Sequence, residues 1–172
     1  MSDTLAVDLK ASLAWLFSES LSLSTVIDNA SLEYDQSLED GTAADQADLL
    51  WHDERAIAAS ANDDLDLTAL SQTVFGSPLA VNFAKVKAIL LINTSTMAGD
   101  RLRLGGAGAA AFSAPFAADD DAVVEIGPDS PLLLASKKDG WTVTGGTADV
   151  LRVHNPGANE ITYKIAIVGT SA

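Results

Sequence analysis

Two histidines are the residues of this 172-residue chain best suited to acid–base chemistry, and the chain has no cysteine. His52 lies between Trp51 and Asp53 in a predicted strand, and His154 ends another predicted strand. The Gly-x-Ser-x-Gly turn that presents a nucleophilic serine is absent. We expect structural roles for both histidines and no enzymatic activity. A hydrolase with dispersed catalytic residues is the alternative, because a triad is assembled by the fold rather than by sequence spacing.

Two further segments carry residue types that bind ions. The run Asp119–Asp121 offers the carboxylate oxygens that calcium prefers, but the spacing of an EF-hand loop is absent. The glycine-rich segment 105–108 follows a predicted strand and lacks the Lys-Ser/Thr ending of a phosphate-binding loop. We therefore expect neither a metal ion nor a cofactor.

The charge balance argues against several classes of partner. The chain has 24 acidic and 10 basic residues and a net charge of -14, whereas nucleic-acid binding depends on lysine and arginine contacts to phosphate. No apolar run approaches the roughly 20 residues that a membrane helix needs, and the first residues lack the basic segment of a secretory signal. We expect no nucleic-acid partner, no membrane partner, and synthesis in a bacterial cytoplasm, which a cysteine-free chain suits.

Short apolar segments separated by Gly, Pro, Asn and Asp fill the C-terminal two thirds of the chain. They lie at residues 84–92, 101–104, 122–126, 131–134, 141–144, 150–153 and 161–168. Such spacing is typical of strands in an all-β sandwich or barrel. We predict a jelly-roll-like antiparallel β-sandwich over residues 49–172. Within it, Gly145-Gly146 is expected to join strands 141–144 and 150–153 as a hairpin, and residues 68–80 are expected to form a loop or short helix.

Residues 1–48 differ from the rest of the chain in their pattern of apolar and polar residues. Apolar side chains alternate with small or polar ones at Leu13, Trp15 and Phe17, and this period of two favours a strand over a helix. A helix over residues 5–17 is the competing interpretation, but the serine-rich segment that follows is poor helix material. We predict an extended N-terminal arm or hairpin over residues 1–48, with residues 43–48 as its linker.

An extended arm with apolar residues on one side can add a strand to the sheet edge of a neighbouring chain. The predicted partner-binding residues of the arm are Leu13, Trp15, Phe17, Leu21 and Leu23. The alternative is that this segment forms the first β-hairpin of the same domain. In the small-residue segment 105–116, Phe112 and Phe116 are predicted to contact another subunit, or alternatively to pack back onto the sandwich.

Several segments resemble a group of small virion proteins of tailed bacteriophages. They are residues 44–53 (ADQADLLWHD), 83–89 (FAKVKAI), 93–95 (NTS) and 163–170 (YKIAIVGT). The resemblance implies a capsid decoration, or cement, protein on the capsid surface of the virion. It implies two partners: the major capsid protein, and further copies of this chain in a homotrimer. The family has no catalytic motif to transfer.

Two other functions fit the same predicted fold. The first is a tail or neck component of the virion, which binding to the capsid lattice would distinguish from a decoration protein. The second is a carbohydrate-binding β-sandwich, which needs an exposed aromatic platform. Trp15, Trp51 and Trp141 are the candidates for such a platform.

Overall fold

Strands make up almost all of the regular structure, in a computed structural model that describes residues 4–74 and 77–172. The one helical segment among these residues is a single 3-10 turn, η1 (Ala114–Phe116). The predicted all-β class is therefore confirmed. It follows from the short segments of alternating apolar residues and the glycines, prolines and aspartates between them.

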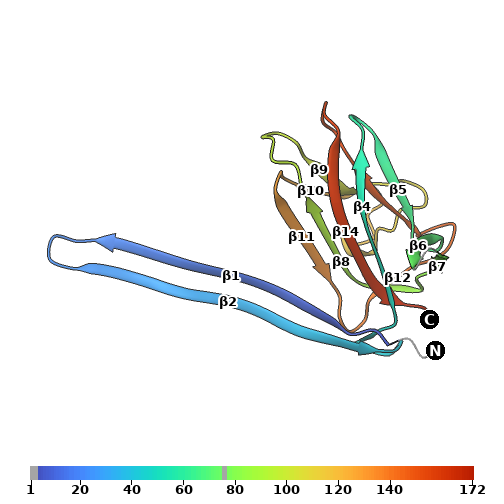
Figure 1. Cartoon of the computed structure of the whole chain (residues 1–172), viewed down its shortest axis with the longest axis horizontal. Coiled ribbons are helices and arrows are strands. Elements are labelled where there is room, and N and C mark those ends of the chain that lie inside the picture. Colours follow the sequence, from blue (N-terminus) through green and yellow to red (C-terminus); the bar gives the residue numbers. More distant parts are fainter. Residues whose placement is uncertain (1–3, 75–76) are drawn as a thin grey trace.

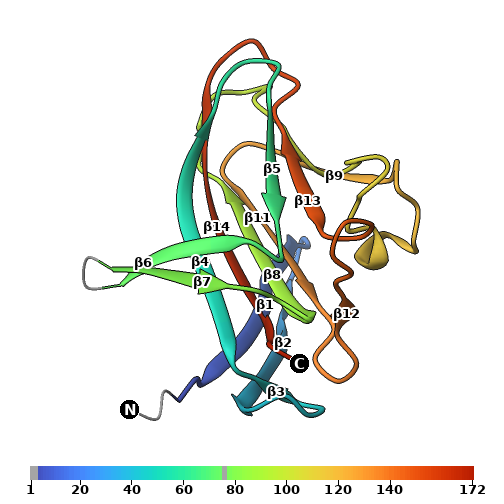
Figure 2. The same cartoon turned by 90° about the vertical axis from the view of Figure 1, so that its right-hand side faces the viewer.

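Eight strands form two facing sheets with the order of a double-sheet jelly roll (Figure 2). The first sheet has the order β11 (Ser130–Ala135), β8 (Lys85–Asn93), β14 (Ile161–Thr170), β4 (Leu49–Ile57), and β12 (Trp141–Thr142) adds to β8. The second sheet has the order β10 (Val123–Ile126), β9 (Leu102–Gly105), β13 (Val150–His154), β5 (Asn62–Asp66). All strand pairs within the two sheets are antiparallel.

The core lies between the two sheets and is filled by alternate residues of each strand. On β14, Ile161, Tyr163, Ile165 and Ile167 are buried, whereas Thr162 and Lys164 between them are exposed. The second sheet contributes side chains that are completely buried, namely Leu102, Leu104, Leu151 and Val153. The alternation of the sequence thus determines which face of each strand points inward.

Two predicted connections differ from the structure. Within residues 68–80, a hairpin of β6 (Leu70–Val74) and β7 (Ser77–Val81) replaces the expected loop or helix; residues 75–76 lie outside the described part of the chain. Gly145-Gly146 lies in a tight turn that an antiparallel bridge between Thr144 and Ala148 closes, but the strands on either side do not pair beyond this bridge. Instead β12 pairs with β8 and β13 pairs with β5 and β9, so the two strands belong to different sheets.

The N-terminal segment forms one long β-hairpin that projects from the sandwich (Figure 1). Its strands are β1 (Val7–Ser20) and β2 (Thr25–Asp40), paired without interruption from Val7↔Leu38 to Ser20↔Thr25. The predicted strand, rather than a helix, is therefore confirmed over this segment. At a rise of about 3.3 Å per residue the ribbon is roughly 45 Å long.

A small apolar cluster fixes the root of the hairpin to the sandwich. Leu9 and Leu38 pack there with Ala47, Ala88 and Val168. The predicted linker 43–48 contains the short strand β3 (Gln46–Ala47), which runs parallel to the end of β2. The hairpin therefore leaves the sandwich from a packed junction.

A polar network joins the two sheets across the edge of the core. Arg55 of β4 donates two hydrogen bonds to Asp63 of β5, at 2.5 and 2.9 Å, and the hydroxyl of Tyr163 on β14 donates to the same carboxylate at 2.9 Å. Burial is the main cause that raises the pKa of Tyr163, so the phenol stays protonated and keeps donating. This network satisfies groups that would be costly to bury unpaired.

The buried Asp100 ties the loop between β8 and β9 to the loop between β13 and β14. Its carboxylate accepts hydrogen bonds from the Ser95 hydroxyl at 2.6 Å and the Asn159 amide at 3.1 Å, and its backbone carbonyl accepts one from Asn93. The hydrogen bond from Ser95, followed by that from Asn159, lowers the pKa of Asp100 below its ordinary value of 3.8. Since the folded-state pKa is depressed, the ionised group stabilises the fold above pH 3.8, and this contribution disappears as the pH falls through the folded pKa.

We predict that Asp100→Asn lowers the urea midpoint of unfolding at pH 7. The difference between the variant and the original chain should shrink as the pH falls below about 4, because the original carboxylate then becomes protonated as well. Urea unfolding followed by tryptophan fluorescence at pH 7, 5 and 3 measures this effect. A pH-independent difference would contradict the assigned role of the Asp100 charge.

Candidate partner-binding surface

The hairpin has one apolar and one polar face, because directly paired residues of two antiparallel strands point to the same side. We define the apolar face by its paired rows Val7↔Leu38, Ala11↔Tyr34, Leu13↔Leu32 and Trp15↔Ala30, together with Leu9 and Phe17. Three polar residues, Gln36, Asp28 and Glu19, share this face, and Nε1 of Trp15 donates to Asp28 at 3.1 Å. The polar face carries Asp8, Lys10, Ser12, Glu33 and Asp35 between them. On this face Lys10 forms an ion pair with Asp35 at 3.3 Å.

Beyond its root, the apolar face is open to solvent. Leu13 is 67 % exposed and its partner Leu32 is 71 % exposed, whereas Leu38 at the root is only 1 % exposed. Trp15, Phe17 and Tyr34 are exposed as well. An exposed apolar surface of this kind is unusual on a monomeric protein and is typical of interaction sites.

The far end of the hairpin is apolar on both sides. Phe17 and Val26 lie on the apolar face, while Leu16 and Ile27 lie on the opposite face. We call these four residues, together with Leu21 and Leu23 of the turn, the hairpin tip. Leu23 is 98 % exposed, so a surface that covers only one side of the ribbon would leave part of the tip in water.

The structure brings the predicted arm residues onto this one hairpin, but not all onto one face. Leu13, Trp15 and Phe17 share the apolar face as their spacing indicates. Leu21 and Leu23 are predicted to lie on the same side of the arm as these three residues. They lie instead in the turn, after β1 has ended at Ser20. The backbone N–H of Leu21 donates to the carbonyl of Ser24 at 2.7 Å and closes that turn.

The second predicted contact, in the small-residue segment 105–116, differs from expectation at Phe112. Its side chain is 1 % exposed and belongs to the core between the sheets, and its backbone N–H donates to the carbonyl of Val150. Phe116 is partly buried and packs against the same core. The segment therefore closes the sandwich, and Phe112 has no surface to offer a partner.

Several exposed apolar residues were not singled out from the sequence. Val26, Ile27 and Leu32 lie on β2, the strand paired with the predicted arm, and their exposure becomes evident only once the hairpin register is known. Leu50 and Leu90 lie on the outer face of the five-stranded sheet and are each 37 % exposed. The signal for Leu90 is the uninterrupted apolar run 88–92, since half-buried antiparallel strands normally alternate.

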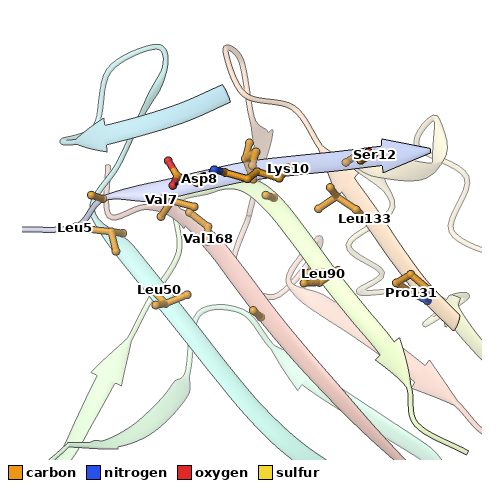
Figure 3. A pocket seen from close by; sticks show the side chains of 15 residues that line it. Leu5, Val7, Asp8, Lys10, Ser12, Leu50, Leu90, Pro131, Leu133 and Val168 are labelled. Carbon is orange, nitrogen blue, oxygen red and sulfur yellow. Dashed lines mark ion pairs between the residues drawn. The ribbon is translucent and has the colours of Figure 1, made fainter. Parts of the chain in front are cut away.

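A groove separates the hairpin root from this outer sheet face (Figure 3). It has a volume of about 710 Å³ and is lined mainly by apolar side chains. Val7 and Leu9 of β1 form one wall, and Leu50, Leu90 and Leu133 of the sheet form the other. The groove holds no cluster of groups suited to catalysis.

The histidines have neighbours that suit structural roles. His52 is exposed and contacts the Gln72 amide at 2.8 Å, and Nδ1 of His154 lies 2.7 Å from the Asn62 side-chain oxygen. His154 lines an open groove with Asp121, but no hydroxyl, thiol or amine lines that groove. In residues 4–74 and 77–172, no group of three or more His, Cys, Asp or Glu side chains is arranged to hold a metal ion.

Both arginines that line this groove are already engaged, and Arg103 donates to Glu125 at 3.2 Å. Arg152 donates to both oxygens of Asp64, at 2.6 and 2.8 Å. This guanidinium lowers the pKa of Asp64 below its ordinary range. The pair therefore joins β13 to β5 and leaves little of the arginine for a ligand.

The three tryptophans do not form an aromatic platform. Trp15 is exposed on the hairpin, whereas Trp51 is 2 % exposed in the core and donates from Nε1 to the Ser71 carbonyl at 3.0 Å. Trp141 is partly buried against the same core. A carbohydrate platform requires coplanar, exposed rings, so this arrangement does not favour glycan binding.

No protein-family model matches the chain, and a search of curated proteins finds no significant match. Within the described residues, no helix has the length and apolar character needed to cross a membrane. The apolar hairpin is therefore the feature on which a functional proposal can be based.

We predict opposite outcomes for two leucines of the same hairpin strand. Leu38→Ala removes a buried side chain from the root and should cost about 2 kcal/mol or more, which raises the open fraction of the root about 30-fold. Leu32→Ala removes an exposed side chain and should change stability by less than about 0.5 kcal/mol.

Limited proteolysis within residues 5–48 measures this difference, with unfolding of the sandwich followed in parallel. The first variant should be cleaved much faster than the second. Equal cleavage of both variants would show that the cluster of Leu9, Leu38, Ala47, Ala88 and Val168 does not hold the root.

Proposed function

We propose that this chain is a non-enzymatic structural protein of a tailed-phage virion, made in the host bacterial cytoplasm. Its proposed role is that of a capsid decoration protein, which binds the lattice of the major capsid protein and stabilises it as a homo-oligomer, expected to be a trimer. The observation that carries the proposal is the projecting hairpin with its exposed apolar face and tip. The resemblance of segments 44–53 and 163–170 to phage virion proteins directs it to the capsid.

The hairpin has the properties of an anchor. It is joined to the sandwich by a packed root, and its tip lies farthest from that root (Figure 1). A two-stranded ribbon is at best marginally stable by itself in water. Binding that buries the tip would therefore stabilise the ribbon and connect the sandwich to the lattice at the same time.

The sandwich suits the outer part of such an assembly. Hydrogen-bonded pairs join its strands, and the side-chain neighbours of the two histidines are Gln72 and Asn62. The net charge of -14 gives a strongly hydrated surface. These features support a binding and stabilising role rather than a chemical one.

We predict saturable co-sedimentation of the protein with empty capsids of its phage that lack it. The variant Phe17→Ser/Leu23→Ser removes two apolar contacts of the tip and should weaken capsid binding by at least about 30-fold, as loss of an interface anchor does. The matched control is Ala14→Ser, a conservative change on the polar face at a similar distance along the ribbon.

Binding at a lattice stoichiometry that the tip variant loses and the control retains would support the decoration role. Equal binding by all three proteins would exclude the tip as the anchor. Failure of the original chain to bind capsids, combined with binding to purified tails or necks, would replace the decoration role by the tail or neck alternative.

A further inference from the structure

We propose that the apolar face of the hairpin of one copy lies on the outer face of the five-stranded sheet of another copy. The inference names the surfaces through which the proposed homo-oligomer forms, and it therefore rests on the self-association part of the proposed function. It does not depend on capsid binding.

The outer sheet face is apolar where it approaches the hairpin. Register places Leu50, Val168 and Ala88 in one row across the sheet, and Ala166, Leu90 and Leu133 in the next. Leu50 and Leu90 remain 37 % exposed in the single chain. A strand with apolar residues on both faces, as β8 has from Ala88 to Ile92, is typical of a sheet that is covered on both sides. The apolar part of the outer face follows β8 and β11, whereas β4 and β14 carry His52, Glu54 and Lys164 on it.

The root shows that the two surfaces fit each other. Leu9 and Leu38, the first residues of the apolar face, already pack on Ala88 and Val168 of the outer sheet face. The groove beside them is lined by Ala11 of the hairpin and by Leu90 of the sheet. A second ribbon on the sheet would extend a packing arrangement that the chain already makes.

A chain cannot complete this contact with its own hairpin. The root cluster holds the base of the ribbon, and the ribbon then runs away from the sandwich (Figure 1). Leu13, Trp15 and Leu32 therefore remain exposed in the same molecule that exposes Leu50 and Leu90. Each copy has one apolar ribbon and one apolar sheet face. When the ribbon of one copy covers the sheet face of another, both kinds of surface are buried.

The dimensions agree with a stable interface. From Ala11 to Ser20 the ribbon measures about 34 Å by 10 Å, given the rise and spacing of strands. When two copies exchange ribbons with each other, each covers a footprint of roughly 680 Å², close to the roughly 800 Å² that each partner buries in a standard interface. The footprint ends at Ser20 and covers only the apolar face, so Leu21 and Leu23 of the turn and Leu16 and Ile27 on the opposite face stay available to a lattice protein.

The absence of native cysteine permits a specific test. Full-length chains carrying Leu13→Cys are mixed with differently tagged full-length chains carrying Leu90→Cys, and the mixture is treated with a short bis-maleimide. We expect a mixed crosslink between the two tags. Ala14→Cys is the matched control, because it neighbours Leu13 but points to the opposite face of the ribbon. Equal crosslinking of Leu13→Cys and Ala14→Cys to Leu90→Cys would overturn the proposal.

Sedimentation of the full chain provides an independent readout. Leu90→Glu places a charge in the proposed contact and should raise the dissociation constant of the oligomer at least about 30-fold. Val123→Glu changes an exposed apolar residue of β10 in the second sheet, away from the proposed contact, and should leave the dissociation constant unchanged. An original chain that is monomeric at every accessible concentration would contradict the inference.

Failure of this inference can be distinguished from failure of the capsid proposal. A crosslinked oligomer that does not bind capsids supports the inference and contradicts the decoration role. A monomer that binds capsids through the tip contradicts the inference and supports that role.

Discussion

The constraint on which the structure depends is that a two-stranded ribbon has no interior. Every apolar side chain of β1 and β2 beyond the root faces solvent unless something else covers it. The backbone hydrogen bonds between the strands compensate only weakly, since the same groups can bond to water. The sandwich buries most of its apolar residues between its sheets, whereas the hairpin beyond its root leaves its large apolar side chains exposed. We therefore propose that the state of the hairpin depends on a partner.

The packed root determines the direction in which the hairpin leaves the sandwich. Because Leu9 and Leu38 are buried against the outer sheet face, the ribbon is held at its base and carries its remaining apolar residues away from the sandwich. Gly169 contributes at this junction: a Cβ there would meet the Lys85 carbonyl oxygen at 2.0 Å, so the close approach of β14 to β8 requires glycine. The apolar surface is thus presented at a distance that can reach another molecule.

The sequence predicts some of these features and not others, for physical reasons. Alternation at Leu13, Trp15 and Phe17 identifies a face, because strand periodicity is local. It does not reveal that Leu21 begins a turn, nor that the strand containing Trp141 joins a different sheet from the one containing Val150, because pairing between distant strands leaves no local pattern. For Phe112 the sequence leaves two positions open, a contact with another subunit and packing onto the sandwich. Only the assembled fold shows that its side chain lies in the core.

Amide hydrogen exchange of the hairpin in the dilute protein, and again in the concentrated protein with capsids present, tests the central claim most directly. The account predicts fast exchange throughout β1 and β2 beyond the root when the protein is dilute, next to slow exchange in β8 and β14. Exchange in the hairpin should slow greatly once its apolar face and tip are covered. Slow exchange of the hairpin in the dilute monomer, or no change on assembly, would contradict a hairpin that depends on a partner.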